Sequence, residues 1–582
     1  MNKLLEKVKA GLKKAKFDNV DLYEWRSSIV LTGRVNSWDE KIQAGYIAAN
    51  KGYKGVVNDI KVVGAKTDEM AKPDIYDNSL EGEQFDVVII GGGITGCSIA
   101  RELSRYNITI ALLEKEEDLA KHASGRNDGM IHPGIADKPS SKKAHYNIRG
   151  NRAYGKICEE LGVDFQRPGS FILFNSPISE LLLPILMVRA EQNGVDGYKF
   201  FTRRKVKEMI PYVTEKQFGG FFLPSAGVLS PYKLTVAMAE NAVQNGVKIL
   251  LNTFLLGFEM EKGHIAKIKT NRGNITSGVV VNAAGIWADT VADYASDRFF
   301  SLHGRKGVDA ILDKKTGKYQ PTIMAMPDLL SFKGSHTKGG GLITTPEGNL
   351  LIGPTANEVP TREDYSTEPN DIDELMKHLE LNTKLKRTDI ITYFAGIRAC
   401  TYEEDFIIEP SSYVDNLVHA AGIQSPGLAS APAIAHDISK MVCTILKKTN
   451  EIKNKENFNP KRITFPELNK LSLEDRAKII KENPSYGRIV CRCEQISEGE
   501  IKNTLHSPIP VLSLDGLKRR FRIGAGRCQG GFCTPRVMEI MSEELNIKLT
   551  DIKKKGAGSE ILFNETKENV SYSDKKLKTM LE

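Results

Sequence analysis

Apolar stretches that end at glycine-rich turns are the strongest pattern along the chain. Residues 85–90 (FDVVII) have the composition of a buried strand, and residues 97–103 (CSIAREL) follow with the pattern of a helix. Residues 108–113 (ITIALL) and 279–283 (VVVNA) repeat the strand pattern. Buried strands that alternate with helices are typical of a parallel sheet covered on both faces, so the sequence predicts an α/β core.

The N-terminal part has a different pattern. A lysine-rich amphipathic helix is followed by strand patterns at residues 29–35 and 55–62, and between them Ser37 and Glu40 form the capping-box pattern that opens a helix. This order of elements predicts a small α+β module over residues 1–66. The module resembles a BON domain, which is often linked to phospholipid or surface attachment; an accessory module of another use is the alternative.

Polar segments and a group of cysteines predict the remaining boundaries. We expect a linker at residues 67–82, an α/β region at 83–450, a second linker at 451–485, a cysteine-rich module at 486–545 and a polar tail at 546–582. The chain is therefore expected to contain one large unit flanked by two small modules.

Composition narrows the class of protein. Of 582 residues, 41% are hydrophobic and 26% are charged, which is ordinary for a globular protein and excludes disordered and fibrous classes. The net charge of +8 does not require a nucleic-acid partner and tolerates an anionic substrate or membrane face. The N-terminal segment lacks the apolar core of a signal peptide, and no apolar run reaches the roughly 20 residues that span a bilayer. We expect a cytoplasmic protein, with peripheral membrane contact left open.

The turn after the first strand carries a dinucleotide-binding pattern. Glycines 91, 93 and 96 form G-x-G-x-x-G between strand and helix. Gly91 permits the tight turn, Gly93 lets the backbone approach a pyrophosphate, and Gly96 lets helix and strand pack closely. The second strand ends at Glu114, 18 residues after Gly96, where a carboxylate can accept a hydrogen bond from a ribose hydroxyl. This motif alone does not separate NAD from FAD.

Later segments resemble the FAD-dependent oxidoreductases of the D-amino-acid oxidase and glycerol-3-phosphate dehydrogenase family. They are residues 123–134 (ASGRNDGMIHPG), 279–289 (VVVNAAGIWAD), 394–398 (FAGIR) and 422–432 (GIQSPGLASAP), in the family's order. The resemblance covers residues 83–445 and implies an FAD-binding Rossmann-like domain interleaved with an antiparallel-sheet substrate domain. The FAD contacts that it implies are Gly91, Gly93, Ile94, Gly96, Glu114, Ser124, Asn127, Gly129, Met130, Ala284, Gly285, Ile423, Gln424, Gly427 and Ala429.

The substrate end of such a fold needs a base and an anion-binding group. Oxidation of a secondary alcohol requires hydride transfer to the flavin and removal of the hydroxyl proton. His132 is the candidate base, because histidine titrates near the operating pH; orienting the flavin loop is its alternative role. Arg398 is the candidate anchor, since a guanidinium binds phosphate or carboxylate bidentately. The resemblance places Arg398 and Ser425 where glycerol-3-phosphate oxidases and dehydrogenases hold the substrate phosphate.

Two basic residues elsewhere can complete this anion clamp. Arg305 and Lys306 follow His303, a weaker candidate base, and solvated surface charges are their alternative role. Pro133 departs from the small residues that the family has after the histidine. Because proline has no N–H, a backbone contact to the substrate is in doubt at that position.

Four of the eight cysteines gather near the C-terminal end of the chain. Cys491 and Cys493 form a C-x-C pair, and after 34 intervening residues Cys528 and Cys533 form a C-x4-C pair. Four thiolates in these pairs, without histidine, favour an iron–sulfur cluster, with a structural zinc site as the alternative. The segment resembles the bacterioferritin-associated-ferredoxin-like [2Fe-2S] domain, which also ends the large subunit of anaerobic glycerol-3-phosphate dehydrogenase. The resemblance implies that these four cysteines bind the cluster.

Taken together, the resemblances imply an FAD-dependent dehydrogenase that oxidises glycerol 3-phosphate to dihydroxyacetone phosphate. Electrons are expected to pass from the reduced flavin through a [2Fe-2S] cluster to a soluble carrier protein or to membrane-anchored, quinone-reducing subunits. One alternative is a dehydrogenase or oxidase of the same fold that acts on L-2-hydroxyglutarate or another 2-hydroxy acid. A second alternative is a non-catalytic electron-transfer subunit.

Overall fold

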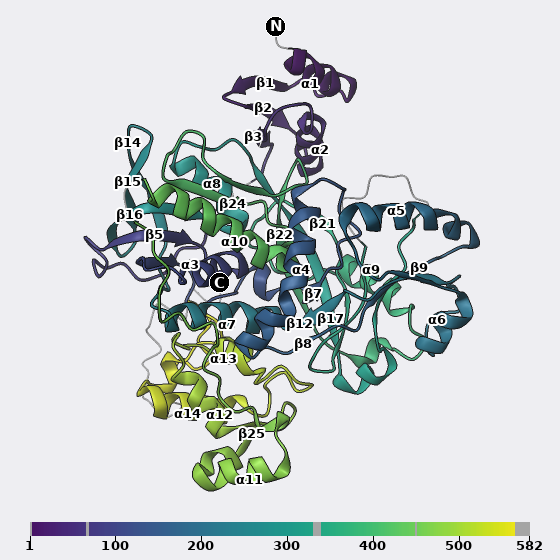
Figure 1. The fold of residues 1–582 in the computed structure, drawn as a ribbon, viewed down its shortest axis with the longest axis vertical. Coiled ribbons are helices and arrows are strands. Elements are labelled where there is room, and N and C mark those ends of the chain that lie inside the picture. Colours follow the sequence, from purple (N-terminus) through teal and green to yellow (C-terminus); the bar gives the residue numbers. More distant parts are fainter. Residues whose placement is uncertain (1–2, 66–68, 330–338, 449–450, 565–582) are drawn as a thin grey trace. The chain divides into compact units, whose positions relative to one another are not determined.

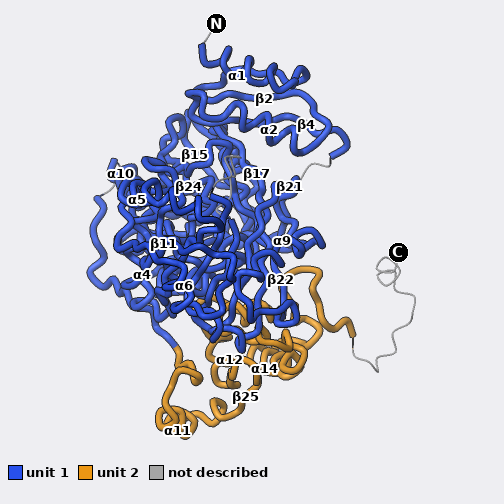
Figure 2. Tube along the Cα trace, turned by 90° about the vertical axis from the view of Figure 1, so that its right-hand side faces the viewer, with its two compact units in different colours: residues 1–464 blue, residues 465–582 orange. Residues whose placement is uncertain are grey.

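The chain forms two compact units, and its structure is known from a computed structural model. The units are residues 1–464 and residues 465–582 (Figure 2). The residues that the structure describes are 3–65, 69–329, 339–448 and 451–564. No helix within these ranges has the length and apolar character needed to cross a bilayer.

The N-terminal module lies within the first unit and has the α+β fold that its sequence predicts (Figure 1). Its elements are α1 (Lys3–Lys14), β1 (Val20–Trp25), β2 (Ser28–Val35), α2 (Trp38–Ala48), β3 (Val56–Asn58) and β4 (Lys61–Val62). The capping box is present, because the Ser37 hydroxyl accepts the Glu40 N–H while the Glu40 carboxylate accepts the Ser37 N–H. Such a cap stabilises a helix by about 1 kcal/mol.

A largely parallel sheet forms the dinucleotide-binding half of the first unit. Its parallel strands, in spatial order, are β13 (Lys248–Leu250), β6 (Ile110–Leu113), β5 (Gln84–Ile90), β16 (Gly273–Asn282) and β24 (Leu417–Ala421). Antiparallel strands β14 (Leu255–Glu261), β15 (His264–Thr270) and β23 (Ile407–Pro410) extend it. Val87, Val88 and Ile89 of β5 are buried on both faces, as the apolar run predicts.

Helices flank this sheet. They are α3 (Ile94–Leu103), α4 (Lys142–Leu161), α7 (Pro231–Gln244), α8 (Ala288–Tyr294) and α10 (Gly427–Leu446). Helix α3 packs between α7 and α10, and α10 packs on α4. The carboxyl ends of the parallel strands therefore meet at one edge of the sheet, which is where ligands bind in such folds.

The other half of the first unit is a mixed, mainly antiparallel sheet, as the resemblance implies. Its order is β10 (Lys199–Phe201), β11 (Gly220–Leu223), β9 (Ser170–Leu173), β18 (Ile323–Ala325), β19 (Gly341–Thr344), β20 (Leu350–Gly353), β17 (Leu302–Leu312) and β21 (Asn357–Val359), with β22 (Ile390–Thr401) also paired to β17. A further small sheet consists of β7 (Met130–Ile131), β12 (Gly227–Leu229) and β8 (Phe165–Gln166). The register of β17 and β22 places Arg305 directly opposite Arg398.

The second unit is a small helical module with its own core. It contains α11 (Leu473–Glu482), β25 (Ile489–Cys491), β26 (Ile496–Ser497), α12 (Glu498–Leu505), α13 (Leu514–Phe521) and α14 (Thr534–Leu545). Its core includes Cys491, Cys533 and Ile552, so this unit extends beyond the predicted boundary at residue 545.

The predicted second linker, residues 451–485, is divided between the two units. On the first unit, Arg462 forms an ion pair of 2.7 Å with Glu240. On the second, the Leu468 N–H donates to Glu500 at 3.0 Å. Polar composition suggested a linker, but these groups have buried carboxylate partners within each unit.

Candidate active site

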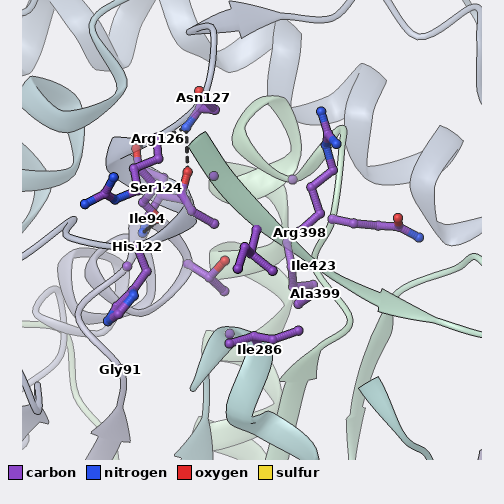
Figure 3. Close-up of a pocket in the computed structure, with 18 of the residues that line it drawn as sticks. Gly91, Ile94, His122, Ser124, Arg126, Asn127, Ile286, Arg398, Ala399 and Ile423 are labelled. Atoms are coloured by element: carbon purple, nitrogen blue, oxygen red, sulfur yellow. Dashed lines mark hydrogen bonds between the residues drawn. The ribbon is translucent and has the colours of Figure 1, made fainter. Parts of the chain in front are cut away.

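The turn between β5 and α3 lines a cavity in the first unit (Figure 3). Gly91 has a φ angle of +111°, and a Cβ atom there would lie 2.4 Å from the carbonyl oxygen of Ala283. Gly93 is the N-cap of α3 and brings no side chain to the helix start, while the Ser124 hydroxyl accepts the Ile94 N–H at 2.8 Å. The turn therefore has the features that let a backbone approach a pyrophosphate at a helix N-terminus.

Glu114, which follows β6, fixes this turn. Its carboxylate accepts the backbone N–H groups of Gly92, at 2.7 Å, and Glu116, at 2.9 Å. The side chain lines the cavity, and burial raises the pKa of its carboxyl above the usual range. The predicted contact with a ribose hydroxyl stays a prediction, while the hydrogen bonds show a role in shaping the glycine turn.

Most of the residues predicted to contact FAD meet at this one cavity. Those that line it are Gly91, Gly93, Ile94, Glu114, Ser124, Asn127, Met130, Ala284, Gly285, Ile423, Gln424 and Gly427. Figure 3 shows Ser124 and Asn127 on one side and Ile286 and Ile423 on the other. These residues come from separated segments of the chain, and their convergence on a glycine turn fits FAD.

Three residues of the predicted FAD set do not line the cavity. A Cβ atom at Gly96 would lie 2.0 Å from the carbonyl oxygen of Gly91. One at Gly129 would lie 2.2 Å from the carbonyl oxygen of Leu229. Ala429 lies where α10 meets α4, so close that a Cβ atom at Gly150 would be 2.0 Å from its carbonyl oxygen. These positions serve the close packing of loop and helices around the cavity.

His132 and Ser425, two predicted substrate residues, are brought together across 293 positions of sequence. The Ser425 hydroxyl lies 3.3 Å from Nε2 of His132, and both residues line the cavity. The Asn151 amide donates to the carbonyl oxygen of His132 at 2.9 Å. His132 is therefore held at the cavity both by a contact to its ring and by a hydrogen bond to its backbone.

Arg398 lines the same cavity from β22. Both of its terminal nitrogens lie 3.3 Å from the carbonyl oxygen of Thr355, and the guanidinium stacks over Gly307, where a Cβ atom would lie 2.5 Å from it. No carboxylate of the described residues lies within ion-pair distance of it. A guanidinium that faces a cavity with its charge uncompensated by a carboxylate is suited to an anionic substrate.

The two other predicted anion ligands have different surroundings. Arg305 lines the cavity, but its guanidinium already pairs with Glu358 at 2.7 Å and Glu404 at 2.6 Å. Lys306 lies outside the cavity lining, on the opposite face of β17, within 3.9 Å of Asp371. The structure therefore does not bring Lys306 to the cavity, and two carboxylates neutralise Arg305.

His122 and Asp309 are two of the lining residues that belong to none of the sequence motifs. His122 lies between Glu116, at 3.1 Å, and the Tyr365 hydroxyl. Asp309 of β17 is 1% exposed, and one of its carboxylate oxygens has no hydrogen-bond partner among the described residues. Burial raises the pKa of the Asp309 carboxyl well above its usual range, and the charge of Arg398 opposes this shift. No spacing in the sequence marks either residue.

The four clustered cysteines lie as two pairs in the second unit. The sulfur atoms of Cys493 and Cys528 are 3.6 Å apart, and the thiols of Cys491 and Cys533 are hydrogen-bonded. Backbone N–H groups donate to the sulfurs of Cys491 and Cys528, as happens around iron–sulfur centres. Among the described residues no three His, Cys, Asp or Glu side chains surround a single metal position. Two pairs of thiols fit a [2Fe-2S] cluster, in which each iron takes two protein ligands.

Comparison with known families agrees with both sites. The chain matches the FAD dependent oxidoreductase family over residues 86–441 and the BFD-like [2Fe-2S] binding domain over residues 489–543. The first match contains most of the cavity lining, and the second contains all four paired cysteines.

Individual relatives point to the same class of enzyme. A glycerol 3-phosphate dehydrogenase of Caloramator mitchellensis is 38% identical over 84% of this chain and 100% of its own length. One subunit of the anaerobic glycerol-3-phosphate dehydrogenase of Haemophilus influenzae is 26% identical over 81% of this chain and 87% of its own. The solved structure of L-alpha-glycerophosphate oxidase from Mycoplasma pneumoniae with FAD bound superposes with a TM-score of 0.61, at 27% identity, over 66% of this chain and 100% of its own.

Replacing Gly91 should weaken FAD binding. In Gly91→Ala the methyl group meets the Ala283 carbonyl oxygen and the residue keeps a left-handed φ, a strain of about 1–3 kcal/mol, so we expect roughly 10-fold weaker binding or more. FAD retained per protein and titration of the FAD-depleted protein measure the effect. Gly155→Ala is the matched control, because a Cβ atom there meets nothing within 4 Å. Equal FAD retention by the two variants would contradict this role of the turn.

Replacing Cys528 should remove the cluster and leave FAD in place. Serine cannot supply the thiolate, so Cys528→Ser is expected to lose iron and acid-labile sulfide while its flavin absorbance persists. Cys443→Ser, on α10 in the first unit, is the control and should keep both. The assignment fails if Cys528→Ser retains the iron and sulfide of the unmodified protein.

Proposed function

The chain belongs to the FAD-dependent oxidoreductase family, and from this premise we propose that it oxidises glycerol 3-phosphate to dihydroxyacetone phosphate. It is an oxidoreductase that binds FAD and a [2Fe-2S] cluster. The observation that carries the substrate proposal is Arg398, whose guanidinium faces the cavity with no carboxylate partner among the described residues. A phosphate ester supplies the anion that this guanidinium lacks.

A short chain of contacts connects the proposed base, His132, to the proposed anion site at Arg398. Arg398 is the strand partner of Arg305, and Arg305 donates to Gln424 at 3.4 Å. Gln424 precedes Ser425, which holds Nε2 of His132. Phosphate and reacting hydroxyl are neighbours on a three-carbon substrate, so one molecule can engage Arg398 and His132 together.

His132 and Arg398 have separate roles in the proposed oxidation of the secondary alcohol. When bound, FAD supplies the acceptor for the hydride that leaves carbon 2. His132, as neutral imidazole, accepts the hydroxyl proton, and Ser425 and the Asn151 amide orient it. Arg398 binds the phosphate and holds the carbon chain in register with the base.

The iron–sulfur module supports a dehydrogenase that delivers electrons to a further protein. A [2Fe-2S] cluster carries single electrons, and we propose that it passes them to a soluble carrier or to quinone-linked membrane subunits. The Haemophilus influenzae relative is named as one subunit of its enzyme, which favours a partner protein here also. Cytoplasmic location, peripheral membrane contact and the BON-like character of residues 1–66 stay predictions.

An anaerobic substrate panel tests this function. Glycerol 3-phosphate should bleach the flavin absorbance of the holoenzyme and then reduce the cluster band, whereas glycerol, which lacks the anion, should not. Bleaching by L-2-hydroxyglutarate but not by glycerol 3-phosphate would overturn the substrate proposal. No reduction by any hydroxy substrate would instead indicate a non-catalytic electron-transfer subunit.

The same panel on Arg398→Gln tests the anion anchor. Hydrogen bonds to charged groups contribute about 1.5–3 kcal/mol, so the glycerol 3-phosphate concentration for half-maximal reduction should rise about 10- to 150-fold. Arg152→Gln is the control. Arg152 lies on α4 and forms an exposed ion pair with Asp196, so this variant should bind substrate normally. An unchanged half-maximal concentration in Arg398→Gln would mean that the phosphate binds elsewhere.

Replacing His132 should separate proton transfer from flavin binding. General-base catalysis contributes about 10²–10⁴-fold, so we expect His132→Gln to slow flavin reduction by that factor in stopped-flow measurements while retaining FAD. His264→Gln, whose exposed imidazole pairs with Asp415, is the control. Loss of FAD at an unchanged reduction rate would mean that His132 only orients the flavin loop.

A further inference from the structure

The N-terminal module and the flavin-binding part share one hydrophobic core. Tyr402, which follows β22, is 2% exposed and belongs to the apolar cluster of the module. Its ring lies against Gly45 of α2, where a Cβ atom would be 2.2 Å away. The Asn58 amide of β3 donates to the Tyr402 hydroxyl at 2.9 Å. The module is therefore packed into the wall of the first unit and is not merely tethered to it.

Polar contacts fix the same interface. Arg26 forms an ion pair of 3.0 Å with Asp297, which is 1% exposed. The Ser301 N–H donates to the carbonyl oxygen of Val56 at 2.8 Å. Backbone and charge thus hold the module in one orientation, so a side chain on its surface can have a defined position within the first unit.

Tyr46 of α2 is such a side chain. Its hydroxyl accepts a hydrogen bond from Arg305 at 2.7 Å and donates one to Glu404 at 2.8 Å. Arg305 and Glu404 are themselves 2.6 Å apart. The tyrosine ring contacts the rings of His303 and Tyr402, each with centroids 5.6 Å away. The hydroxyl also lies 3.4 Å from Nε2 of His303, so it joins a buried arginine, the carboxylate of that arginine and a histidine in one network.

This network meets the cavity at Arg305 itself and also at Gln424, to which it is hydrogen-bonded. The Gln424 amide donates to Glu404 at 2.7 Å, and its carbonyl oxygen accepts from Cys400 at 2.8 Å and Arg305 at 3.4 Å. The amide is thus fixed at both ends, and Gln424 lines the cavity directly before Ser425. A shift of Arg305 or Glu404 would release the residue next to the His132 contact.

Burial makes the network sensitive to each partner. Arg305 is 4% exposed, and Glu404 has a φ angle of +57°, a conformation that a non-glycine residue adopts at a cost. Burial alone would raise the pKa of Glu404, but the hydrogen bond and charge of Arg305 outweigh it and lower that pKa to about 2. Removing one partner of a buried charged group is strongly destabilising. The hydrogen bonds of the Tyr46 hydroxyl therefore stabilise the charged forms of Arg305 and Glu404.

We propose that the N-terminal module is part of the active site, with Tyr46 as a positioning residue that holds Arg305 and Glu404 and thereby keeps Gln424 in the cavity wall. The module supplies no group to the reacting atoms in this arrangement. It shapes the segment that carries Ser425, so the effect reaches the flavin environment and the substrate step together. The inference rests on the proposed function only for its kinetic readout.

Tyr46→Phe in the full-length holoenzyme tests the proposal, because it removes the hydroxyl and keeps the ring packing. Since hydrogen bonds to charged groups are affected, we expect kcat/KM to fall about 10-fold, mainly through kcat. We also expect the visible absorption bands of the bound flavin to shift and its FAD dissociation constant to rise several-fold. These two readouts need no substrate, so they decide the proposal even if glycerol 3-phosphate is not oxidised.

Two comparison variants separate positioning from general stability. Tyr53→Phe makes the same substitution in the same module, where the hydroxyl donates to Glu24 at an exposed position, and should match the unmodified enzyme. Asn58→Ala loosens the docking contact with Tyr402 and should lower the thermal unfolding midpoint without shifting the flavin bands. A flavin shift in Asn58→Ala as large as that in Tyr46→Phe would overturn the specific role of Tyr46.

A double-mutant cycle with Glu404→Gln completes the test. If both residues act through one network, the fall in kcat/KM in Tyr46→Phe/Glu404→Gln should be no greater than the larger of the two single-variant falls. A combined loss equal to the product of the two single losses would overturn the proposal. So would a Tyr46→Phe enzyme whose flavin bands, FAD affinity and kinetics equal those of Tyr53→Phe.

Discussion

The pairing of β17 with β22 is the constraint on which the substrate end of the cavity depends. It places Arg305 and Arg398 directly opposite each other, and two like charges in this position repel. The two arginines differ in the groups that offset this repulsion. Glu358 and Glu404 neutralise Arg305, whereas Arg398 bonds to a backbone carbonyl oxygen and has no carboxylate of the described residues within ion-pair distance. Arg305 thus has the surroundings of a structural residue, and Arg398 is the residue proposed to bind the substrate anion.

Local patterns were sufficient for the parts of the molecule that are built from neighbouring residues. The glycine turn at Gly91 could be predicted because a strand, a tight turn and a helix follow one another directly in sequence. The C-x-C and C-x4-C spacings marked the four cysteines for the same reason, but the structure pairs them across the sequence, Cys493 with Cys528 and Cys491 with Cys533. In the first case family resemblance then chose FAD, and in the second a [2Fe-2S] cluster, where spacing alone left other ligands open.

Residues whose roles depend on register could not be predicted in this way. Arg305 and Lys306 are adjacent and chemically similar, but alternate residues of a strand point to opposite faces, so only Arg305 lines the cavity. Asp309 lies four residues after Arg305 on the same strand and carries no motif. Tyr46 is still harder to find, since its partners Arg305 and Glu404 lie 259 and 358 residues away.

The shared core of the module and the first unit changes what an N-terminal accessory module can do. A tethered module can bind a surface without any effect on the cavity. Here Tyr402 and Tyr46 join the two parts through buried contacts, so their free energies are linked. A ligand or surface that bound one position of α2 more tightly would shift the Arg305–Glu404 network through these contacts, and a ligand in the cavity would then act back on the module by the same free energy. The hydrogen bonds that Tyr46 makes contribute to this coupling by about 1.5–3 kcal/mol each at most for a charged partner.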